Sequence, residues 1–138
     1  MASLYNLEIV TPDCKFFDGQ TEMCIVRTTE GDVGILYDHE PLVAPVSIGK
    51  IRIRKDGEFV SAACAGGFLT VDEDRVVIVT DAAEWAEEID IDRAKDSYER
   101  AKERINSGND KEIDVARAHA SLTKAINRLR VAGHDTDN

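Results

Sequence analysis

The sequence predicts a segregated α+β protein, in which an N-terminal antiparallel β-sandwich is followed by a C-terminal antiparallel α-helical hairpin. Three observations favour this class. Short apolar segments separated by polar turns fill the N-terminal part of the chain. From about Ala83 the apolar spacing changes to steps of three and four. A glycine, Gly133, then follows the last of these steps. We expect a sandwich over residues 1–86 and a two-helix hairpin over residues 87–138.

The strand predictions rest on alternation and on turn residues. Ile51 and Ile53 alternate with arginines, which is the period of a half-buried strand. The Asp56-Gly57 dipeptide predicts a tight hairpin turn, after which residues 59–64 resume the extended pattern. The β-branched run over residues 76–79 predicts a strand buried on both faces. Many short strands with regular turns are typical of a sandwich or barrel.

Two glycines, Gly66 and Gly67, interrupt one of these strand patterns. Glycine inside a strand indicates a bulge or a close approach of two backbones. No nucleophile or base lies beside the pair, so we do not interpret it as catalytic.

Two helices are predicted after the strands. The first has its apolar residues on one face, with Asp90 as its cap. Residues 107–110 (Ser-Gly-Asn-Asp) interrupt it, a second helix follows, and Gly133 suits its C-terminus. A short break between two helices predicts an antiparallel hairpin. The apolar positions of the two helices are Ile91, Ala94, Tyr98, Ala101 and Ile105, and Val115, Ala118, Leu122, Ala125, Leu129 and Ala132.

Alanine fills much of the expected seam between these helices. Each large buried side chain contributes about 1.5–3 kcal/mol, whereas ordering each residue costs about 1–2 kcal/mol of backbone entropy. Backbone hydrogen bonds recover part of that cost, and the margin is small. We therefore expect a hairpin that is stable only when docked and that can exchange one docking surface for another.

The last helix is basic in an acidic protein. The chain has a formal net charge of -10, yet residues 115–132 contain no acid and four cations, Arg117, Lys124, Arg128 and Arg130. Complementary charge guides docking, so this helix predicts an acidic partner. An alternative is that Arg128 and Arg130 only offset the negative end of the helix dipole.

Composition excludes several classes of protein. Strong acidity argues against nucleic-acid binding, and no apolar run is long enough to span a bilayer. The N-terminus lacks the features of a secretory signal. Cys14, Cys24 and Cys64 lie in strand-like stretches without metal-ligand spacing, so we expect reduced, apolar residues and no disulfide. No phosphate-binding Gly-x-x-x-x-Gly-Lys-Ser/Thr loop and no catalytic constellation is present, so an enzyme is not expected.

Four motifs, in order along the chain, now resemble one family, the epsilon subunit of bacterial F-type ATP synthase, equivalent to the mitochondrial delta subunit. The resemblance covers almost the whole chain. The motifs are Val10-Thr11-Pro12-Asp13, Glu30-Gly31-Asp32-Val33-Gly34-Ile35-Leu36 with His39, Pro41 and Leu42 after it, Gly66-Gly67-Phe68, and Ile89-Asp90-Ile91-Asp92-Arg93-Ala94.

The resemblance implies a non-catalytic subunit of the central stalk, peripheral on the cytoplasmic face of the bacterial membrane and touching it only through the complex. Its partners are the gamma subunit, the c-ring and the α3β3 head. The sandwich binds the stalk foot and the c-ring, while the helices fold on the sandwich or extend into the head, where they block ATP hydrolysis. The acidic partner of Arg117, Lys124, Arg128 and Arg130 is then a segment of the β subunit.

The resemblance also implies a gamma and c-ring surface at Glu30, Gly31, Asp32 and His39. An ordinary polar turn is the alternative for residues 30–32. Tyr37-Asp38 stands where the family usually has Pro-Gly, which leaves the loop conformation open. His39 is not expected to bind a metal, because no other histidine or cysteine is placed to join it.

No cofactor is required, but several bacterial relatives bind ATP as a regulatory ligand. The matching positions here are Ile89, Asp90, Arg93, Ala94, Arg100, Lys124 and Arg128. Arg93 and Arg100 share a helical face, and two guanidinium groups can hold phosphate oxygens. Lys124 stands where ATP-binding relatives carry an arginine, and lysine lacks the bidentate fork.

Other interpretations remain for this region. Asp90 and Asp92 also suit an ordinary helix start, and Glu87 and Glu88 are expected to be solvated. The alternative function is an ATP-sensing module whose hairpin folds on the nucleotide.

Overall fold

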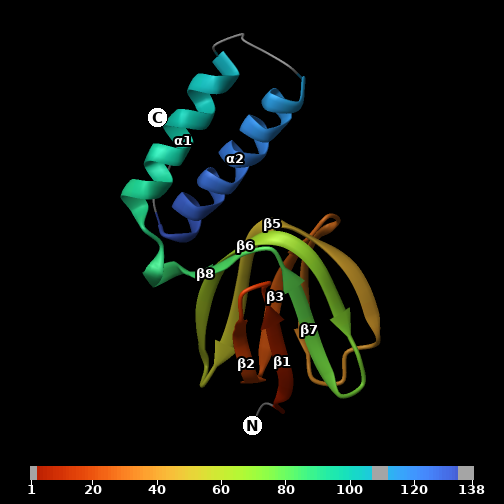
Figure 1. The fold of residues 1–138 in the computed structure, drawn as a ribbon. Coiled ribbons are helices and arrows are strands. Elements are labelled where there is room, and N and C mark those ends of the chain that lie inside the picture. The colour runs from red at the N-terminus through yellow and green to blue at the C-terminus, as the bar shows by residue number, and fades with distance from the viewer. Residues whose placement is uncertain (1–2, 107–111, 134–138) are drawn as a thin grey trace. The chain divides into compact units, whose positions relative to one another are not determined.

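The structure, a computed structural model, describes residues 3–106 and 112–133, without the side chains of residues 112–114. The predicted break at residues 107–110 and His134 lie outside these residues. The chain divides into two compact units, Met1–Trp85 and Ala86–Asn138. The first unit is the β-sandwich and the second the helical hairpin (Figure 1), so the predicted fold class is confirmed.

Long strands that cross between layers build the sandwich. Strands β5 and β6 have 14 residues each, and the N-terminal half of β6 pairs with β8 while its C-terminal half pairs with β7. The sheet order is β2-β1-β7-β6-β5-β3-β4. The strands are β1 (Tyr5–Val10), β2 (Lys15–Thr21), β3 (Met23–Thr28), β4 (Gly31–Leu36), β5 (Leu42–Lys55), β6 (Glu58–Val71), β7 (Arg75–Thr80) and β8 (Ala83–Trp85).

One pairing in the described sheet is parallel, that of β1 with β7, whereas the others are antiparallel. A parallel pair needs a long crossover connection, and here the intervening strands supply it. Short-range turn signals do not reveal such a pairing.

The core lies between the two layers and consists of the alternate residues of each strand. Leu7, Ile9, Ile51, Ile53 and Ile78 are fully buried. The alternation predicted for residues 51–54 is therefore confirmed, because both isoleucines point inward while the arginines stay half-buried.

The prediction for residues 76–79 is wrong on one face. Val76 and Ile78 are buried, but Val79 is 52% exposed on the outer side of β7. A β-branched run shows that extended structure is favoured, but not that a second layer covers it. Val77, which faces the same outer side, is half-buried.

Both predicted glycine features are confirmed. Asp56 and Gly57 form the tight turn between β5 and β6, with φ of 53° and 80°. Gly66 and Gly67 also have positive φ, and they lie where β6 leaves β8 and joins β7. A Cβ at Gly67 would lie 1.8 Å from the Val79 carbonyl oxygen, so the close backbone approach requires glycine.

The second unit begins with a short 3-10 turn, Ala86–Glu88, followed by α1 (Ile91–Asn106) and α2 (Glu112–Val131). Glu87 and Glu88 are exposed, as predicted. Helix α2 starts three residues before Val115, so its first turn includes Glu112 and Asp114 and the helix is not free of acids throughout.

The cysteines are free, as expected, but only two of them behave as apolar residues. Cys24 and Cys64 are buried, whereas Cys14 is exposed in a turn before β2 that a Thr11 N–H to Cys14 carbonyl bond closes at 2.9 Å. Among the described helices, none is long and apolar enough to cross a membrane.

Candidate functional site

The start of α1 is a capped helix terminus. The Asp90 carboxylate accepts a hydrogen bond from the Arg93 backbone N–H at 3.0 Å, and its carbonyl accepts one from the Ala94 N–H at 3.0 Å. Ile89 and Ala94 are buried on either side of the cap. Asp90 therefore acts as the predicted cap, and its carboxylate is already engaged.

The seam between α1 and α2 consists of small residues, as the spacing predicts. Ala94 and Ala101 of α1, and Ala118, Ala125 and Leu129 of α2, are each at most 2% exposed. The larger residues Tyr98, Ile105, Leu122 and Ile126 are only half-buried. The two helices therefore approach closely through alanine, and much apolar surface stays partly open.

This seam fixes the direction of the charged side chains. In both helices, cations precede seam residues by one position, and each residue turns the helix by about 100°. Because the helices are antiparallel (Figure 1), positions of this kind point to the same side of the hairpin. The cations concerned, here called the basic side, are Arg93 and Arg100 of α1 and Arg117, Lys124 and Arg128 of α2.

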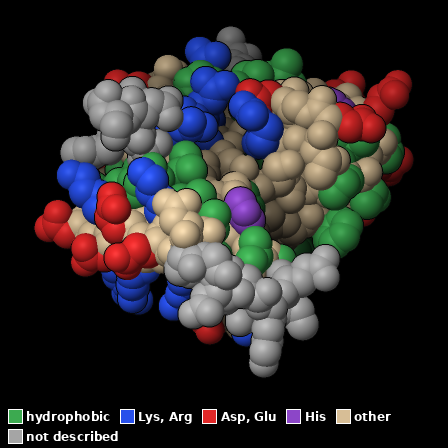
Figure 2. Space-filling model, turned by 90° about the horizontal axis from the view of Figure 1, so that it is seen from above, with side chains coloured by type: hydrophobic (Ala, Val, Ile, Leu, Met, Phe, Trp, Pro, Cys, Tyr) green, Lys and Arg blue, Asp and Glu red, His purple; other side chains and the backbone are tan. Residues whose placement is uncertain are grey.

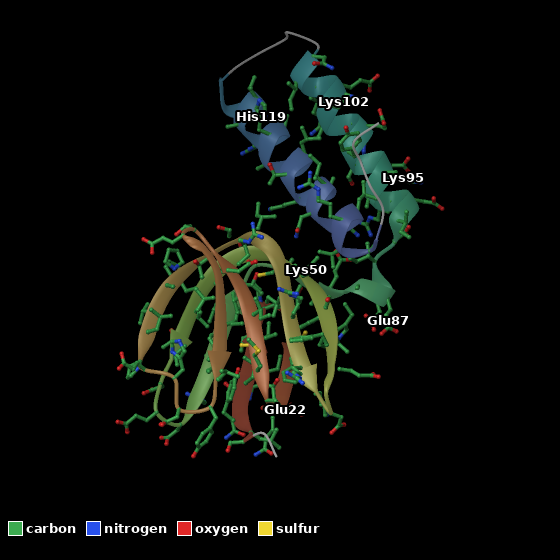
Figure 3. All side chains as sticks on the ribbon, turned by 180° about the vertical axis from the view of Figure 1, so that it is seen from behind. Glu22, Lys50, Glu87, Lys95, Lys102 and His119 are labelled. Atoms are coloured by element: carbon green, nitrogen blue, oxygen red, sulfur yellow. The ribbon has the colours of Figure 1, made fainter. Side chains whose placement is uncertain are left out.

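The opposite side carries a different set. Lys95, Lys102, His119 and Arg130 each follow a seam residue by one position and lie on the other side of the hairpin. The first three are labelled in Figure 3. Arg130 therefore does not share a side with Arg117, Lys124 and Arg128, although the sequence grouped them together. In the view of Figure 2, several Lys and Arg side chains gather in the upper middle, while Asp and Glu side chains lie around them and beside other Lys and Arg at the left.

Side chains on the basic side remain accessible. Arg93, Arg100, Arg117 and Lys124 are exposed, and Arg128 is half-buried. Among the described residues, the Arg100 guanidinium makes long local contacts, at 3.4 Å to the Asp96 carbonyl and 3.4 Å to the Ser97 hydroxyl. Such contacts leave donors that can turn toward an anion.

Glu30 lies in the tight turn between β3 and β4, and Gly31 and Asp32 begin β4, with Gly31 at a φ of 116°. The Arg27 guanidinium donates to both Asp32 carboxylate oxygens. The hydrogen bond from Arg27 lowers the pKa of Asp32, so the carboxylate stays ionised. Asp32 and Glu30 are exposed on the described surface.

His39 lies beyond the other end of β4. A six-residue strand is about 17–20 Å long, so the turn at Glu30 and the loop at His39 are separate surfaces. Asp38 adopts a φ of 68°, the left-handed conformation that favours glycine. The His39 N–H donates to the Leu36 carbonyl at 3.2 Å, which closes this loop.

Sequence reasoning missed an apolar surface on the outside of β5, β6, β7 and β1. Val43 is 72% exposed, Phe68 is 60% exposed and Val79 is 52% exposed. Their positions are adjacent in register, since Phe68 pairs with both Pro45 and Val79, and Val79 pairs with Val10. The β-branched run over residues 76–79 was the sequence signal for this apolar surface. It predicted burial on both faces of the strand, and the outer face is exposed at Val79.

A hollow of about 550 Å³ lies at one end of the sandwich. Tyr5 stands in its wall, held by a hydrogen bond from its hydroxyl to the Ile35 carbonyl at 2.6 Å. Burial raises the pKa of Tyr5, and burial likewise raises the pKa of the adjacent Cys24 thiol to about 11, so both stay neutral near pH 7. Five carboxylates also line the hollow, those of Asp38, Glu40, Asp72, Glu73 and Asp74.

The described residues contain no group of three or more His, Cys, Asp or Glu side chains placed to hold a metal ion. The described sites instead offer exposed cations, exposed apolar residues and an acidic hollow, which are properties of binding surfaces.

Comparison with known proteins covers both units. Residues 4–86 match the family described as ATP synthase, Delta/Epsilon chain, beta-sandwich domain, and residues 87–133 match its long alpha-helix domain. An ATP synthase epsilon chain from Alkaliphilus metalliredigens is 50% identical over 129 residues, covering 94% of this chain and 96% of the relative. One from Bacillus velezensis is 48% identical, covering 94% and 97%.

A solved structure gives the same result. A chain in the Euglena gracilis mitochondrial ATP synthase, solved as OSCP/F1/c-ring, aligns with a TM-score of 0.81 and 25% identity over 95% of this chain and 82% of that chain. With both units matched in order, the chain belongs to the ATP synthase delta/epsilon chain family.

Proposed function

We propose that this chain is a non-catalytic subunit of the central stalk of F-type ATP synthase, which helps to couple proton flow to rotation and restrains ATP hydrolysis. Family membership over both units carries this proposal. The chain would act at the cytoplasmic face of the bacterial membrane, as a peripheral part of the complex. Its partners would be the gamma subunit, the c-ring and the α3β3 head.

Two separate surfaces of the sandwich would serve the stalk. The turn at Glu30, Gly31 and Asp32 and the loop at His39 lie at opposite ends of β4, so they can contact different partners at once. We assign these two surfaces jointly to gamma and the c-ring. The ionised Asp32 suits a polar contact at its end.

Restraint of hydrolysis would come from the hairpin in an extended position. The basic side, with Arg117, Lys124 and Arg128, would meet an acidic segment of the β subunit and stop the stalk from turning under hydrolysis. The thin alanine seam supports a hairpin that can leave one docking surface for another. Arg130 points to the other side of the hairpin, so its part in this contact needs a separate test.

Alanine at Arg117, Lys124, Arg128 and Arg130 together should raise ATP hydrolysis by the complete complex, because the cations that meet the acidic segment are lost. A triple variant with alanine at Arg117, Lys124 and Arg128, which keeps Arg130, tests which side of the hairpin meets the acidic segment. The matched control is alanine at Lys95 and Lys102, two exposed cations on the opposite side. Hydrolysis rates would be measured at low and high salt, since salt weakens exposed ion pairs.

Unchanged hydrolysis in the fourfold variant would refute the braking contact. An equal rise in the Lys95 and Lys102 control would show that charge alone, without a defined side, sets the rate. Hydrolysis by a complex without residues 89–138 gives the upper limit against which both are compared.

A second function, ATP sensing, is favoured by the shared direction of Arg93, Arg100, Lys124 and Arg128 on the basic side. Arginine forks from α1 and cations from α2 could together hold one triphosphate. Ile89, Asp90 and Ala94 would then form the adjoining end of the site, although the Asp90 carboxylate already caps α1. ATP would be a regulatory ligand and would compete with the β subunit for Lys124 and Arg128.

Titration of the isolated chain with ATP tests this second function. Glutamine at Arg93 and Arg100 should weaken binding, and Lys124→Arg should tighten it, because arginine adds a bidentate contact. Glutamine at Lys95 and Lys102 is the control of equal charge. Equal weakening by both pairs of substitutions would argue for a diffuse charge effect in place of a site.

A further inference from the structure

The first residues of β6 form an open edge of the sheet. Strand β8 pairs with residues 62–64 and β7 with residues 67–71, whereas residues 58–61 pair with β5 alone among the described strands. An open edge presents main-chain donors and acceptors that can pair with another extended chain. We call residues 58–61 the β6 edge.

The turn before the β6 edge fixes its hydrogen-bonding register. Asp56 and Gly57 have φ of 53° and 80°, close to the values of the two-residue hairpin turn in which both central residues are left-handed. Lys55 and Glu58 flank this turn and pair with each other. In such a hairpin the flanking residues exchange main-chain hydrogen bonds, so the ladder between β5 and β6 starts with a hydrogen-bonded pair.

Hydrogen-bonded and non-hydrogen-bonded pairs then alternate along this antiparallel ladder. Val60 therefore bonds to Ile53, whereas Phe59 and Ser61 belong to pairs of the other kind. The N–H and C=O groups of Phe59 and Ser61 consequently point away from β5, to the open side. Two donors and two acceptors thus lie in a row at the spacing that an added strand requires.

Both faces of the β6 edge carry exposed apolar residues. Phe59 is 44% exposed on the outer face, and Val60 is 41% exposed on the inner face. Ile53, which pairs with Val60, is fully buried, so the core ends beside the edge and leaves Val60 uncovered. Edge strands are commonly protected by lysine, proline or a bulge, and residues 59–61 (Phe-Val-Ser) have none of these. The β6 edge is therefore suited to pairing.

Two arginines of β5 lie over the outer face of this edge. The guanidinium carbons of Arg52 and Arg54 are each 5.8 Å from the centre of the Phe59 ring. Arg54 also pairs with Glu22, which Figure 3 labels, with 3.6 Å between Nε and Oε2. Within the described residues, no ion pair within 4 Å joins Arg52 to an acid. The Arg52 guanidinium therefore lies beside the open edge with donors to offer an anion.

Charge decides which kind of chain suits the β6 edge. On the outer face, the strand positions of β5 and β6 between residues 50 and 61 carry three cations, Lys50, Arg52 and Arg54, and no acid. A second copy that paired edge to edge would bring its own arginines close to these, and like charges on neighbouring strands are destabilising. A chain with acidic side chains on that face would instead be attracted.

We propose that the β6 edge binds an extended, acidic segment of a partner polypeptide by strand addition. The main-chain groups of Phe59 and Ser61 bond to the main chain of the segment. Val60 packs against an aliphatic side chain on the inner face, and Arg52 receives a carboxylate on the outer face. The site uses none of the residues assigned above to gamma, the c-ring or the β subunit, so it adds a further partner to the sandwich.

A titration of the isolated full chain tests this proposal. The probe is a short synthetic peptide of alternating glutamate and valine, added up to about 1 mM, the range of weak binding. Nuclear magnetic resonance follows the backbone amides. The Phe59 and Ser61 amides should shift and exchange more slowly with solvent, because they gain hydrogen bonds. The Val60 amide, which already bonds to Ile53, should keep its protection.

Two variants test the main-chain and charge contacts separately. Ser61→Pro removes an outward N–H without breaking a bond to β5, so it should weaken peptide binding about tenfold. Arg52→Gln should weaken binding about two- to fivefold, the range of an exposed ion pair. The matched control is Lys55→Gln, which loses the same charge in the same hairpin but on the opposite face, and should bind like the original chain. Thermal unfolding of each variant checks that it is folded.

Peptide controls decide between strand addition and general attraction. A peptide of alternating lysine and valine should bind more weakly, and a glutamate–valine peptide methylated on every main-chain nitrogen should not bind. Equal binding of either control peptide would overturn the proposal, as would unchanged Phe59 and Ser61 amides in the presence of the probe. Shifts of these amides with protein concentration alone would show that a second copy occupies the edge, and would overturn it too.

Discussion

Gly67 shows how a single residue can set the path of a strand. Its φ is 137°, and the space that a side chain would need is occupied by the backbone of Val79. Backbone cannot rotate away as a flexible side chain can. The position therefore admits no other residue without separating β6 from β7.

Gly67→Ala should destabilise the sandwich by about 4 kcal/mol or more, because the new Cβ collides with a strand backbone. Gly57→Ala is the matched control. It also has a positive φ, of 80°, but nothing lies within 4 Å, so its cost should be about 1–2 kcal/mol. Denaturant unfolding can follow both through Trp85, the chain's one tryptophan, which stacks on Phe16 in the sandwich.

At the scale of an element, α1 depends on its cap because its seam is thin. Its buried positions are the two alanines 94 and 101, which bury little surface. Helices with little packing are the ones whose capping bonds matter most. Asp90 supplies such a bond to the Arg93 N–H.

Asp90→Ala should therefore lower the thermal stability of the helical part by about 1 kcal/mol, while Asp90→Asn should retain most of it, because asparagine is also a good cap. Circular dichroism at the helix band measures the hairpin, and Trp85 fluorescence reports on the sandwich at the same time. Equal stability of both variants and the original chain would contradict a structural role for this bond.

The Asp90→Ala and Asp90→Asn variants also distinguish a capping role of Asp90 from a role in ATP binding. If ATP binding is lost in Asp90→Asn while the helix stays stable, the carboxylate has a role beyond capping. If binding falls only in Asp90→Ala, the effect comes through the helix.

At the scale of the whole molecule, opposite charges are divided between surfaces. Residues 1–88 have 17 acids and 7 bases, a charge of -10, and residues 89–138 have 10 of each. The structure concentrates this further, into an acidic hollow on the sandwich and a basic side on the hairpin. A chain with two such surfaces can meet a basic and an acidic partner at the same time.

Features set by neighbouring residues could be predicted from the sequence. The Asp56-Gly57 turn, the Asp90 cap and the alanine seam each depend on contacts within a few residues or on one helical period. The shared side of Arg93, Arg100, Lys124 and Arg128 was also within reach, because each precedes a seam residue by one position.

Features set by distant residues could not be predicted. The parallel pairing of β1 with β7 joins Asn6 to Arg75, and no local signal marks it. The exposure of Val79 depends on whether another chain covers the strand, which one sequence does not record. The separation of Asp32 from His39 follows from β4 continuing through Leu36, although the two residues lie close in the sequence.

The pairing of β1 with β7 has a consequence for how the protein is made. The first strand can pair with β2 early, but it cannot pair with β7 until residues 75–80 have left the ribosome, so the sandwich closes late in synthesis. Strand β8 and the two helices follow β7 in the chain. Since N-terminal domains generally fold first during synthesis, the sandwich of each new copy would close before its two C-terminal helices complete their hairpin.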